Sequence, residues 1–272
     1  MSDSGRISPT AHYTGYVWAR NGLSHPELET VEGRVLFESL RPTMAVTGAV
    51  GPGTLEAYLL ARHLAIDALL ERAIEQHGVT QVLEVACGLS PRGWRFSQRY
   101  GDRITYIEAD LPAMAQRKRA ALARMGALSE RHNVIDLDVL SDDGVKAATA
   151  TLDRDRGLAI ITEGLLVYLP TEAVLDMWRR FTDTLSGFKD GRYLSDMRLN
   201  RDETAATRVF RAGLGVFVRG QVFRHFDDEP AVTAALLEAG FAAAELHLAL
   251  DLVPERKAPG ATQAHIIEAS TS

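Results

Sequence analysis

Residues that suit ligand binding lie at or just after the ends of four short apolar runs of the chain. The runs cover residues 81–86, 104–108, 134–137 and 158–162. Gly88 follows the first run, and the acids at or after the ends of the other three are Asp110, Asp136 and Glu163. Glycine lets the backbone approach a ligand closely, and carboxylates accept hydrogen bonds from hydroxyl and amino groups. The pattern predicts a polar ligand site built from strand ends.

The elements that must position these residues alternate between strand and helix. Strands are predicted over the four runs and over residues 192–197, with helices over residues 54–77, 111–125, 141–152, 171–185 and 230–239. Such alternation indicates an α/β fold, a parallel sheet covered by helices on both faces. Two late strands, at 244–250 and 263–269, suggest an antiparallel hairpin at the sheet edge, and residues 1–50 are predicted to be irregular.

Each strand end leaves two interpretations open. Gly88 lies at a turn that lacks the G-x-G-x-x-G spacing of a dinucleotide site. Asp110, about 20 residues further on, is placed either to bind a ribose diol or to cap the helix that starts near Pro112. Asp136 either accepts from an adenine amino group, with Leu137 against the ring, or is a solvated loop acid.

Composition narrows the class of protein. The chain has 272 residues, 46% hydrophobic and 24% charged, as in an ordinary globular protein. The formal charge of −6 argues against binding nucleic acid by bulk charge. No apolar run reaches the roughly 18 residues of a membrane span, the first residues do not form a signal peptide, and Cys87 is the one cysteine. We therefore expect a cytoplasmic protein with no membrane or nucleic-acid partner, no disulfide and no metal site.

The fourth strand end carries the most specific motif. Residues 163–169 read E-G-L-L-V-Y-L and match the E-G-L-L-x-Y-L pattern typical of one enzyme family. Asp110, Pro112 and Lys118 match its second motif, Asp136-Leu137 its third, and Arg62 precedes an Ile-Asp pair as in that family. Its first motif, D-L-G-A-G-L-D-T-R, reads E-V-A-C-G-L-S-P-R here, so Ala86 replaces the first glycine while Gly88 and Arg92 match.

On these motifs, residues 55–200 resemble the leucine carboxyl methyltransferase family of class I S-adenosylmethionine-dependent O-methyltransferases, which includes polyketide enzymes of the tetracenomycin type. The resemblance implies a Rossmann-like domain with a seven-stranded, mostly parallel sheet, one antiparallel edge strand and S-adenosylmethionine as cofactor. Arg62 would bind the methionine carboxylate, Asp110 the ribose, Asp136 and Leu137 the adenine, and Glu163 would lie by the sulfonium and amino group. The full set of predicted cofactor residues is Arg62, Glu84, Ala86, Cys87, Gly88, Arg92, Glu108, Asp110, Asp136, Leu137, Glu163 and Gly164.

The methyl acceptor should contact parts of the chain that a cofactor fold does not need. We divide the single predicted domain into an N-terminal helical and lid segment (1–77), a cofactor core (78–197), a substrate lid rich in arginine (198–230) and a last part with one helix and the edge strands (231–272). Candidates for positioning the acceptor, or alternatively for packing, are Tyr13, Tyr16, Arg20, Tyr168 and His225.

Three functions remain open on the sequence. The first is methylation of a carboxylate, or of a phenol, on a small natural product such as a polyketide. The second is methylation of a peptide or protein C-terminus. The third is a cofactor-binding protein without transferase activity, or a nicotinamide-dependent oxidoreductase, against which the missing G-x-G-x-x-G argues. A carboxylate is ionised at neutral pH and needs no base, whereas a phenol benefits from one, for which His12, His25, His63 and His225 are candidates. The sequence does not predict the oligomeric state.

Overall fold

A computed structural model describes residues 9–46, 52–202, 223–256 and 261–272 of the chain. The strands are β1 (Val79–Val85), β2 (Thr105–Asp110), β3 (His132–Asp136), β4 (Gly157–Thr162), β5 (Gly191–Met197), β6 (Ala243–Leu248) and β7 (His265–Ser270). The helices are α1 (Pro9–Arg20), α2 (Val31–Val46), α3 (Pro52–Gln76), α4 (Arg92–Tyr100), α5 (Pro112–Arg124), α6 (Gly144–Ala148), α7 (Thr171–Leu185), α9 (Glu229–Glu238) and α10 (Ala249–Leu252). Short 3₁₀ turns include η1 (Pro26–Leu28), η3 (Leu166–Tyr168) and η4 (Asn200–Asp202).

The seven strands form one sheet in the order β3-β2-β1-β4-β5-β7-β6, which confirms the predicted α/β fold. Strands β1 to β5 run parallel, and β7 runs antiparallel to both β5 and β6. The antiparallel strand therefore lies one place in from the edge, which β6 occupies. Strand order reverses at β1, which lies between β2 and β4, and ligands of open α/β sheets bind beyond the carboxyl ends at such a point.

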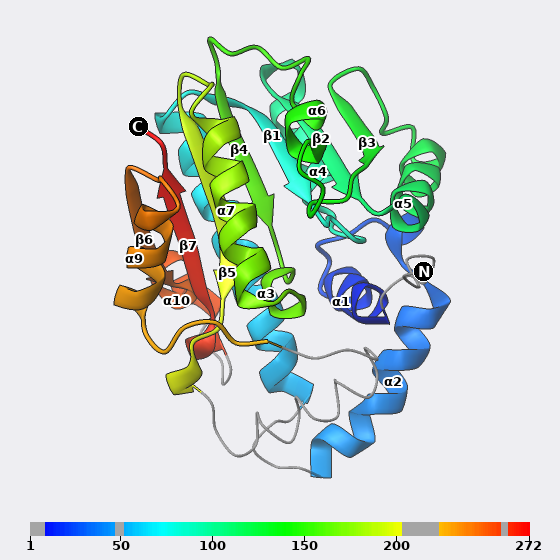
Figure 1. Cartoon of the computed structure of the whole chain (residues 1–272). Coiled ribbons are helices and arrows are strands. Elements are labelled where there is room, and N and C mark those ends of the chain that lie inside the picture. Colours follow the sequence, from blue (N-terminus) through cyan, green and yellow to red (C-terminus); the bar gives the residue numbers. More distant parts are fainter. Residues whose placement is uncertain (1–8, 47–51, 203–222, 257–260) are drawn as a thin grey trace.

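Alternate residues of the central strands point to opposite faces of the sheet. Val82 of β1 and Ala159 of β4 pack in one core with α3, whereas Leu83 and Leu158 pack in another with α7 and α9. Figure 1 shows α7 in front of the sheet and α3 behind it. Each fully buried aliphatic side chain contributes about 1.5–3 kcal/mol, so the two layers fix the strand ends firmly.

The N-terminal segment differs from its prediction, because α1 and α2 replace the expected irregular chain. Its glycines do not break these helices but let them approach. A Cβ on Gly33 of α2 would lie 2.3 Å from the carbonyl oxygen of His12 in α1. Tyr13 stacks on Phe37 across the same contact, with ring centroids 5.5 Å apart. The helix predicted over residues 141–152 is also shorter, since only α6 forms there.

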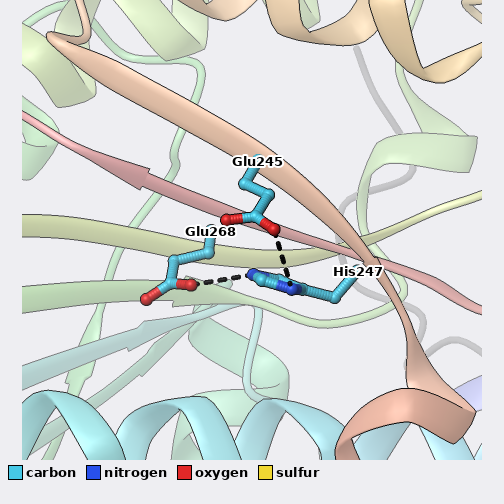
Figure 2. Close-up of side chains that lie close together, drawn as sticks. All are labelled: Glu245, His247 and Glu268. Carbon is cyan, nitrogen blue, oxygen red and sulfur yellow. Dashed lines mark hydrogen bonds and ion pairs between the residues drawn. The ribbon is translucent and has the colours of Figure 1, made fainter.

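A charged cluster of Glu245, His247 and Glu268 lies at the sheet edge formed by β6 and β7, as Figure 2 shows. The Nε2 atom of His247 on β6 lies 2.8 Å from a carboxylate oxygen of Glu268 on β7, and Glu245 lies 3.6 Å from the other ring nitrogen. Glu268 also pairs with Arg72 of α3 and with Arg192. The three residues of Figure 2 are close enough to share a metal ion. Because two arginines already compensate Glu268, we assign the cluster to the stability of the edge.

In the described part of the chain, no helix is long and apolar enough to cross a membrane.

Candidate functional site

The turn after β1 is held in a conformation that favours glycine. Ala86 and Gly88 both have positive φ, +53° and +51°. The backbone N–H of Cys87 donates to the carbonyl of Ala109 on β2, and that of Gly88 donates to the Asp110 carboxylate at 2.7 Å. Ala86 therefore occupies a left-handed position that costs a non-glycine residue about 1–2 kcal/mol. The predicted turn forms, and Asp110 is one of the groups that fix its shape.

Asp110 is not the N-cap of α5. That position belongs to Leu111, whose side chain makes no capping bond, so the helix-cap interpretation is wrong. The second oxygen of Asp110 accepts from the Leu111 N–H at 2.8 Å. Burial raises the pKa of Asp110, against the effect of its two backbone hydrogen bonds. Each carboxylate oxygen keeps one lone pair, so the ribose role stays a prediction that this geometry permits.

A buried group of charges supports the turn from behind. Lys118 of α5 is fully enclosed, donates to the carbonyl of Ser90 at 2.7 Å and pairs with Glu108 of β2. The other oxygen of Glu108 lies 2.7 Å from His132 Nε2. Burial alone would raise the pKa of Glu108, but the Lys118 charge and the His132 contact lower it. Glu108, predicted to bind the cofactor, is thus placed behind the turn rather than at its surface.

Arg92, at the start of α4, is the centre of a second buried group. Its guanidinium is fully enclosed and donates to Asp67 at 2.6 Å, to Glu84 at 2.7 Å and to Glu163 at 2.7 Å. Tyr106 donates to the other oxygen of Glu84. The structure therefore places Arg92 and Glu84 as supports that join α3, β1 and the end of β4. Their predicted part in cofactor binding is indirect in this arrangement.

Arg62 and Glu163 lie together where β4 ends. Arg62 Nε donates to Glu163 at 3.0 Å, and Arg62 Nη1 donates to Asp196 on β5 at 3.1 Å. The third nitrogen, Nη2, makes no hydrogen bond to any described residue and lies against Gly164, where a Cβ would approach it to 3.0 Å. Burial alone would raise the pKa of Glu163, but His63, Arg92 and Arg62 hold it well below its usual range. Glu163 is therefore a permanent anion.

The end of β3 provides an apolar surface beside an acid. Leu137 is buried, and its backbone N–H donates to the Asp110 carbonyl at 2.8 Å. Asp136 is exposed and pairs with Arg119 at 3.0 Å. Cys87 is buried on the neighbouring turn, and burial raises its thiol pKa well above the usual value, as expected for an inert filler. The carboxyl ends of the four predicted strands therefore lie together at one end of the sheet.

Helix α1 covers the turn after β1. A Cβ on Gly88 would lie 3.5 Å from Ala11, and a Cβ on Gly15 would lie 3.1 Å from Leu89. Figure 1 shows α1 at the end of the sheet to which the β1 and β4 arrows point. The Tyr168 hydroxyl, next to this helix, donates to Thr10 at 3.1 Å. The N-terminal segment therefore closes over the site.

The other aromatic candidates of α1 pack against α2. Tyr13 and Tyr16 contact the Phe37 ring at centroid distances of 5.5 and 5.3 Å, and the Arg20 guanidinium lies 4.7 Å from the same centroid. Burial raises the pKa of Tyr13, so its phenol stays neutral. These contacts favour the packing interpretation over contact with an acceptor.

His225 is occupied by two hydrogen bonds. Its Nε2 lies 2.9 Å from the Leu166 carbonyl, which only a ring N–H can satisfy, so Nδ1 accepts from Thr171 at 3.0 Å. Burial lowers the pKa of His225, and the bond to Leu166 offsets this only in part. The neutral ring has no free nitrogen with which to accept a proton. The interpretation of His225 as a general base is therefore wrong for this structure.

Sequence reasoning missed Asp196, and it named His63 only as a candidate base and not as a partner of Glu163. Asp196 accepts from the Gly164 N–H at 2.6 Å and from Tyr58 at 3.3 Å, in addition to Arg62. It lies one residue before the end of β5, so the rule that found the other strand-end acids applies to it as well. His63 is fully buried, with Nδ1 2.8 Å from Glu163. No spacing in the sequence distinguishes it from a core histidine.

Comparison with known proteins decides the family. The leucine carboxyl methyltransferase family model matches residues 29–182. The chain belongs to the leucine carboxyl methyltransferase family. A candidate S-adenosyl-L-methionine-dependent methyltransferase of Frankia alni is 28% identical over 204 residues, which cover 66% of this chain and 68% of that protein. A relative of the same description from Mycolicibacterium vanbaalenii is 36% identical over 106 residues, 39% of this chain and 34% of the relative.

The fold of this family member also matches a solved structure. A candidate methyltransferase of Thermobifida fusca aligns with a TM-score of 0.70 and 13% identity, over 98% of this chain and 96% of that one. At that identity the likeness shows the fold alone. The predicted family and fold are confirmed, and the predicted cofactor is the one that the relatives' descriptions name.

Proposed function

We propose that the chain transfers the methyl group of S-adenosylmethionine to an oxygen atom, and that the acceptor is the carboxylate of a small organic acid, such as a polyketide. The observation that carries the proposal is the meeting of Arg62, Glu163 and the Gly88 turn at the point where strand order reverses. Family membership and the descriptions of the relatives support the cofactor.

The residues at the carboxyl ends of the strands fit such a cofactor. The Nη2 of Arg62, which makes no hydrogen bond to any described residue, can bind the carboxylate of its amino-acid part, since a guanidinium matches carboxylate geometry. The permanent charge of Glu163 attracts the ammonium and sulfonium groups. Asp110 can accept hydrogen bonds from the ribose hydroxyls beside the backbone of Gly88. Leu137 can lie against the adenine. Asp136, the residue before it, can accept a hydrogen bond from the adenine amino group.

The reaction needs positioning more than acid–base catalysis. The bound cofactor supplies an electrophilic methyl group whose sulfur leaves as a neutral thioether. When a carboxylate oxygen forms the new C–O bond, no proton moves, because the acceptor is already ionised at neutral pH. The covering helix α1 would exclude water, which strengthens the attraction between the two opposite charges.

The histidines favour a carboxylate over a phenol. All eight lie in described residues. His225 uses both ring nitrogens, and His63 is fully buried with one nitrogen 2.8 Å from Glu163 and the other 3.3 Å from Arg95. His12 is buried beside Thr30, and burial lowers its pKa. His12, His63 and His225 are therefore poorly placed to act as the base that a phenol acceptor would need, whereas a carboxylate needs none.

A labelled-methyl transfer assay tests this function. Purified protein is incubated with methyl-labelled S-adenosylmethionine and a panel of aliphatic acids, aromatic acids, phenols and peptides with free C-termini. We expect label on small acids, released as methanol by mild base because the product is an ester. Base-stable label on phenols would contradict the carboxylate acceptor, and label confined to peptides would contradict the small-molecule acceptor. Cofactor binding without any transfer across an expanded panel would favour a non-catalytic binding protein.

A further inference from the structure

The ring of Tyr58 lies close to Arg62, which is assigned to the cofactor, and to Arg198, which the proposed reaction has not used. Tyr58 of α3 is 4% exposed, and its hydroxyl donates to Asp196 at 3.3 Å. The Arg62 guanidinium lies 5.6 Å from the ring centroid, and the Arg198 guanidinium lies 4.2 Å from it. Arg198 directly follows β5, so it lies at the same end of the sheet as Glu163 and Gly164.

The two arginines differ in how their charges are balanced. Arg62 is ion-paired with both Glu163 and Asp196. Within the described residues, Arg198 pairs with no carboxylate, and its guanidinium lies over the face of the Tyr58 ring. A guanidinium stacked on a ring keeps its N–H groups, which lie in its own plane, free to donate to a planar anion. Arg198 is half-buried, so its side chain is both held in place and accessible.

We propose that Arg198, stacked on Tyr58, is the subsite that binds the anionic group of the methyl acceptor, and that the ligand class is a carboxylate. This proposal rests on the proposed function, because it assigns the acceptor side of the same site. The Tyr58 hydroxyl links the subsite to Asp196, which in turn bonds to Arg62 and to the Gly164 backbone. Because Arg198 and Arg62 both lie close to the Tyr58 ring, the anion would be held near Arg62, the residue assigned to the cofactor.

Formation of an ester removes the charge that Arg198 recognises. The acceptor enters as an anion and leaves neutral when one of its oxygens takes the methyl group. A charge-assisted hydrogen bond contributes more than a neutral one, so the subsite should hold the acid more tightly than its methyl ester. The same arginine thus selects the substrate and releases the product.

The chain contains a matched control. Arg154 lies 4.1 Å from the centroid of the Phe188 ring and, like Arg198, pairs with no carboxylate among the described residues. It precedes β4, so it lies at the amino end of the strands, away from the site. Arg198 and Arg154 both stack on an aromatic ring, but only Arg198 lies at the carboxyl ends of the strands. Arg154→Gln therefore controls for loss of a stacked positive charge.

The test measures binding of acids to the full chain saturated with S-adenosylhomocysteine. Acetate, octanoate and benzoate are each compared with their neutral amides by ligand-observed NMR titration. The wild type should bind at least one acid more tightly than its amide. Arg198→Gln should reduce that preference about tenfold, the size of one lost charge-assisted hydrogen bond, and Arg198→Lys should retain part of it. Arg154→Gln should match the wild type.

The outcomes separate this proposal from the proposed function. Affinity for S-adenosylhomocysteine, measured by calorimetry, should be equal in all four proteins. If the wild type fails to bind S-adenosylhomocysteine, the proposed function fails. If it binds, but no acid is preferred over its amide, or Arg198→Gln keeps the full preference, the anion subsite is overturned while the cofactor site stands.

Discussion

Glu163 shows at the scale of a single residue how the site is charged. Its carboxylate is 4% exposed and bonds to Arg62, to Arg92 and to His63. Its anionic form therefore depends on three neighbours from two helices. Arg62 and Arg92 in turn depend in part on Glu163, because a buried guanidinium that loses a counter-charge is destabilised.

Replacing this carboxylate by an amide should damage both stability and binding. We expect Glu163→Gln to lower the free energy of unfolding by about 3 kcal/mol, since it leaves buried cations partly uncompensated. Affinity for S-adenosylmethionine should fall as well, and more than affinity for S-adenosylhomocysteine, which keeps the ammonium group but lacks the sulfonium charge. Urea unfolding and calorimetry measure the two effects. Glu172→Gln, on the exposed start of α7, is the control. An equal loss in both variants would refute the structural role of Glu163.

The turn after β1 offers two substitutions with opposite expected effects. Ala86 has a φ of +53°, so Ala86→Gly should relieve strain, less the entropy that glycine adds to the unfolded chain, for a net gain of up to about 1 kcal/mol. Gly88→Ala, at a φ of +51°, should lose about 1–2 kcal/mol. Its added Cβ meets only an ordinary contact with Ala11, so the loss would report backbone strain. Equal changes in the midpoint of urea unfolding would contradict this description of the turn.

Among the helices and strands, those with a clear apolar pattern in the sequence were predicted. Every sheet strand was located within a few residues, because each is a short apolar run bounded by polar residues or glycine. Helices α1 and α2 were missed because residues 1–50 contain glycines and prolines, among them Gly33, which allows a close contact between the two helices that only the folded chain reveals. The Thr171 start of α7 was predicted correctly.

The edge formed by β6 and β7 should respond to acid through Glu268. Burial alone would raise the pKa of Glu268, but the His247 hydrogen bond and the charges of Arg72 and Arg192 lower it. A lowered folded-state pKa gives stability that is fully present above the unfolded value of about 4.3 and is lost as the pH falls through the folded value.

Glu268→Gln should therefore be less stable than the wild type at neutral pH, and the difference should shrink below about pH 4. Urea unfolding at a series of pH values from 3 to 7 measures this difference. Glu245→Gln, whose carboxylate is 72% exposed and touches His247 alone in the cluster, should behave like the wild type. A Glu268→Gln gap that is constant with pH would show that the carboxylate charge does not stabilise this edge.

In the molecule as a whole, the residues of the candidate site lie at one end of the sheet. The ends of β1 to β5, the first half of α3 and helix α1 meet there (Figure 1), and they bring Arg62, Asp110, Glu163 and Asp196 into one region. The strand-end acids were predictable from one-dimensional spacing. The buried partners of Arg92 were not, because His63 and Asp67 reach it from a helix that precedes the sheet in sequence. The arginine-rich lid predicted over 198–230 lies largely outside the described residues.

Binding of S-adenosylhomocysteine to the 272-residue chain tests the assignment of the cofactor site. Calorimetry should show one molecule bound per chain for the wild type and no binding of NAD. Arg62→Ala should weaken the affinity at least tenfold, because it removes the guanidinium assigned to the cofactor carboxylate. Binding of NAD with no binding of S-adenosylhomocysteine, or an Arg62→Ala variant with unchanged affinity, would contradict the account.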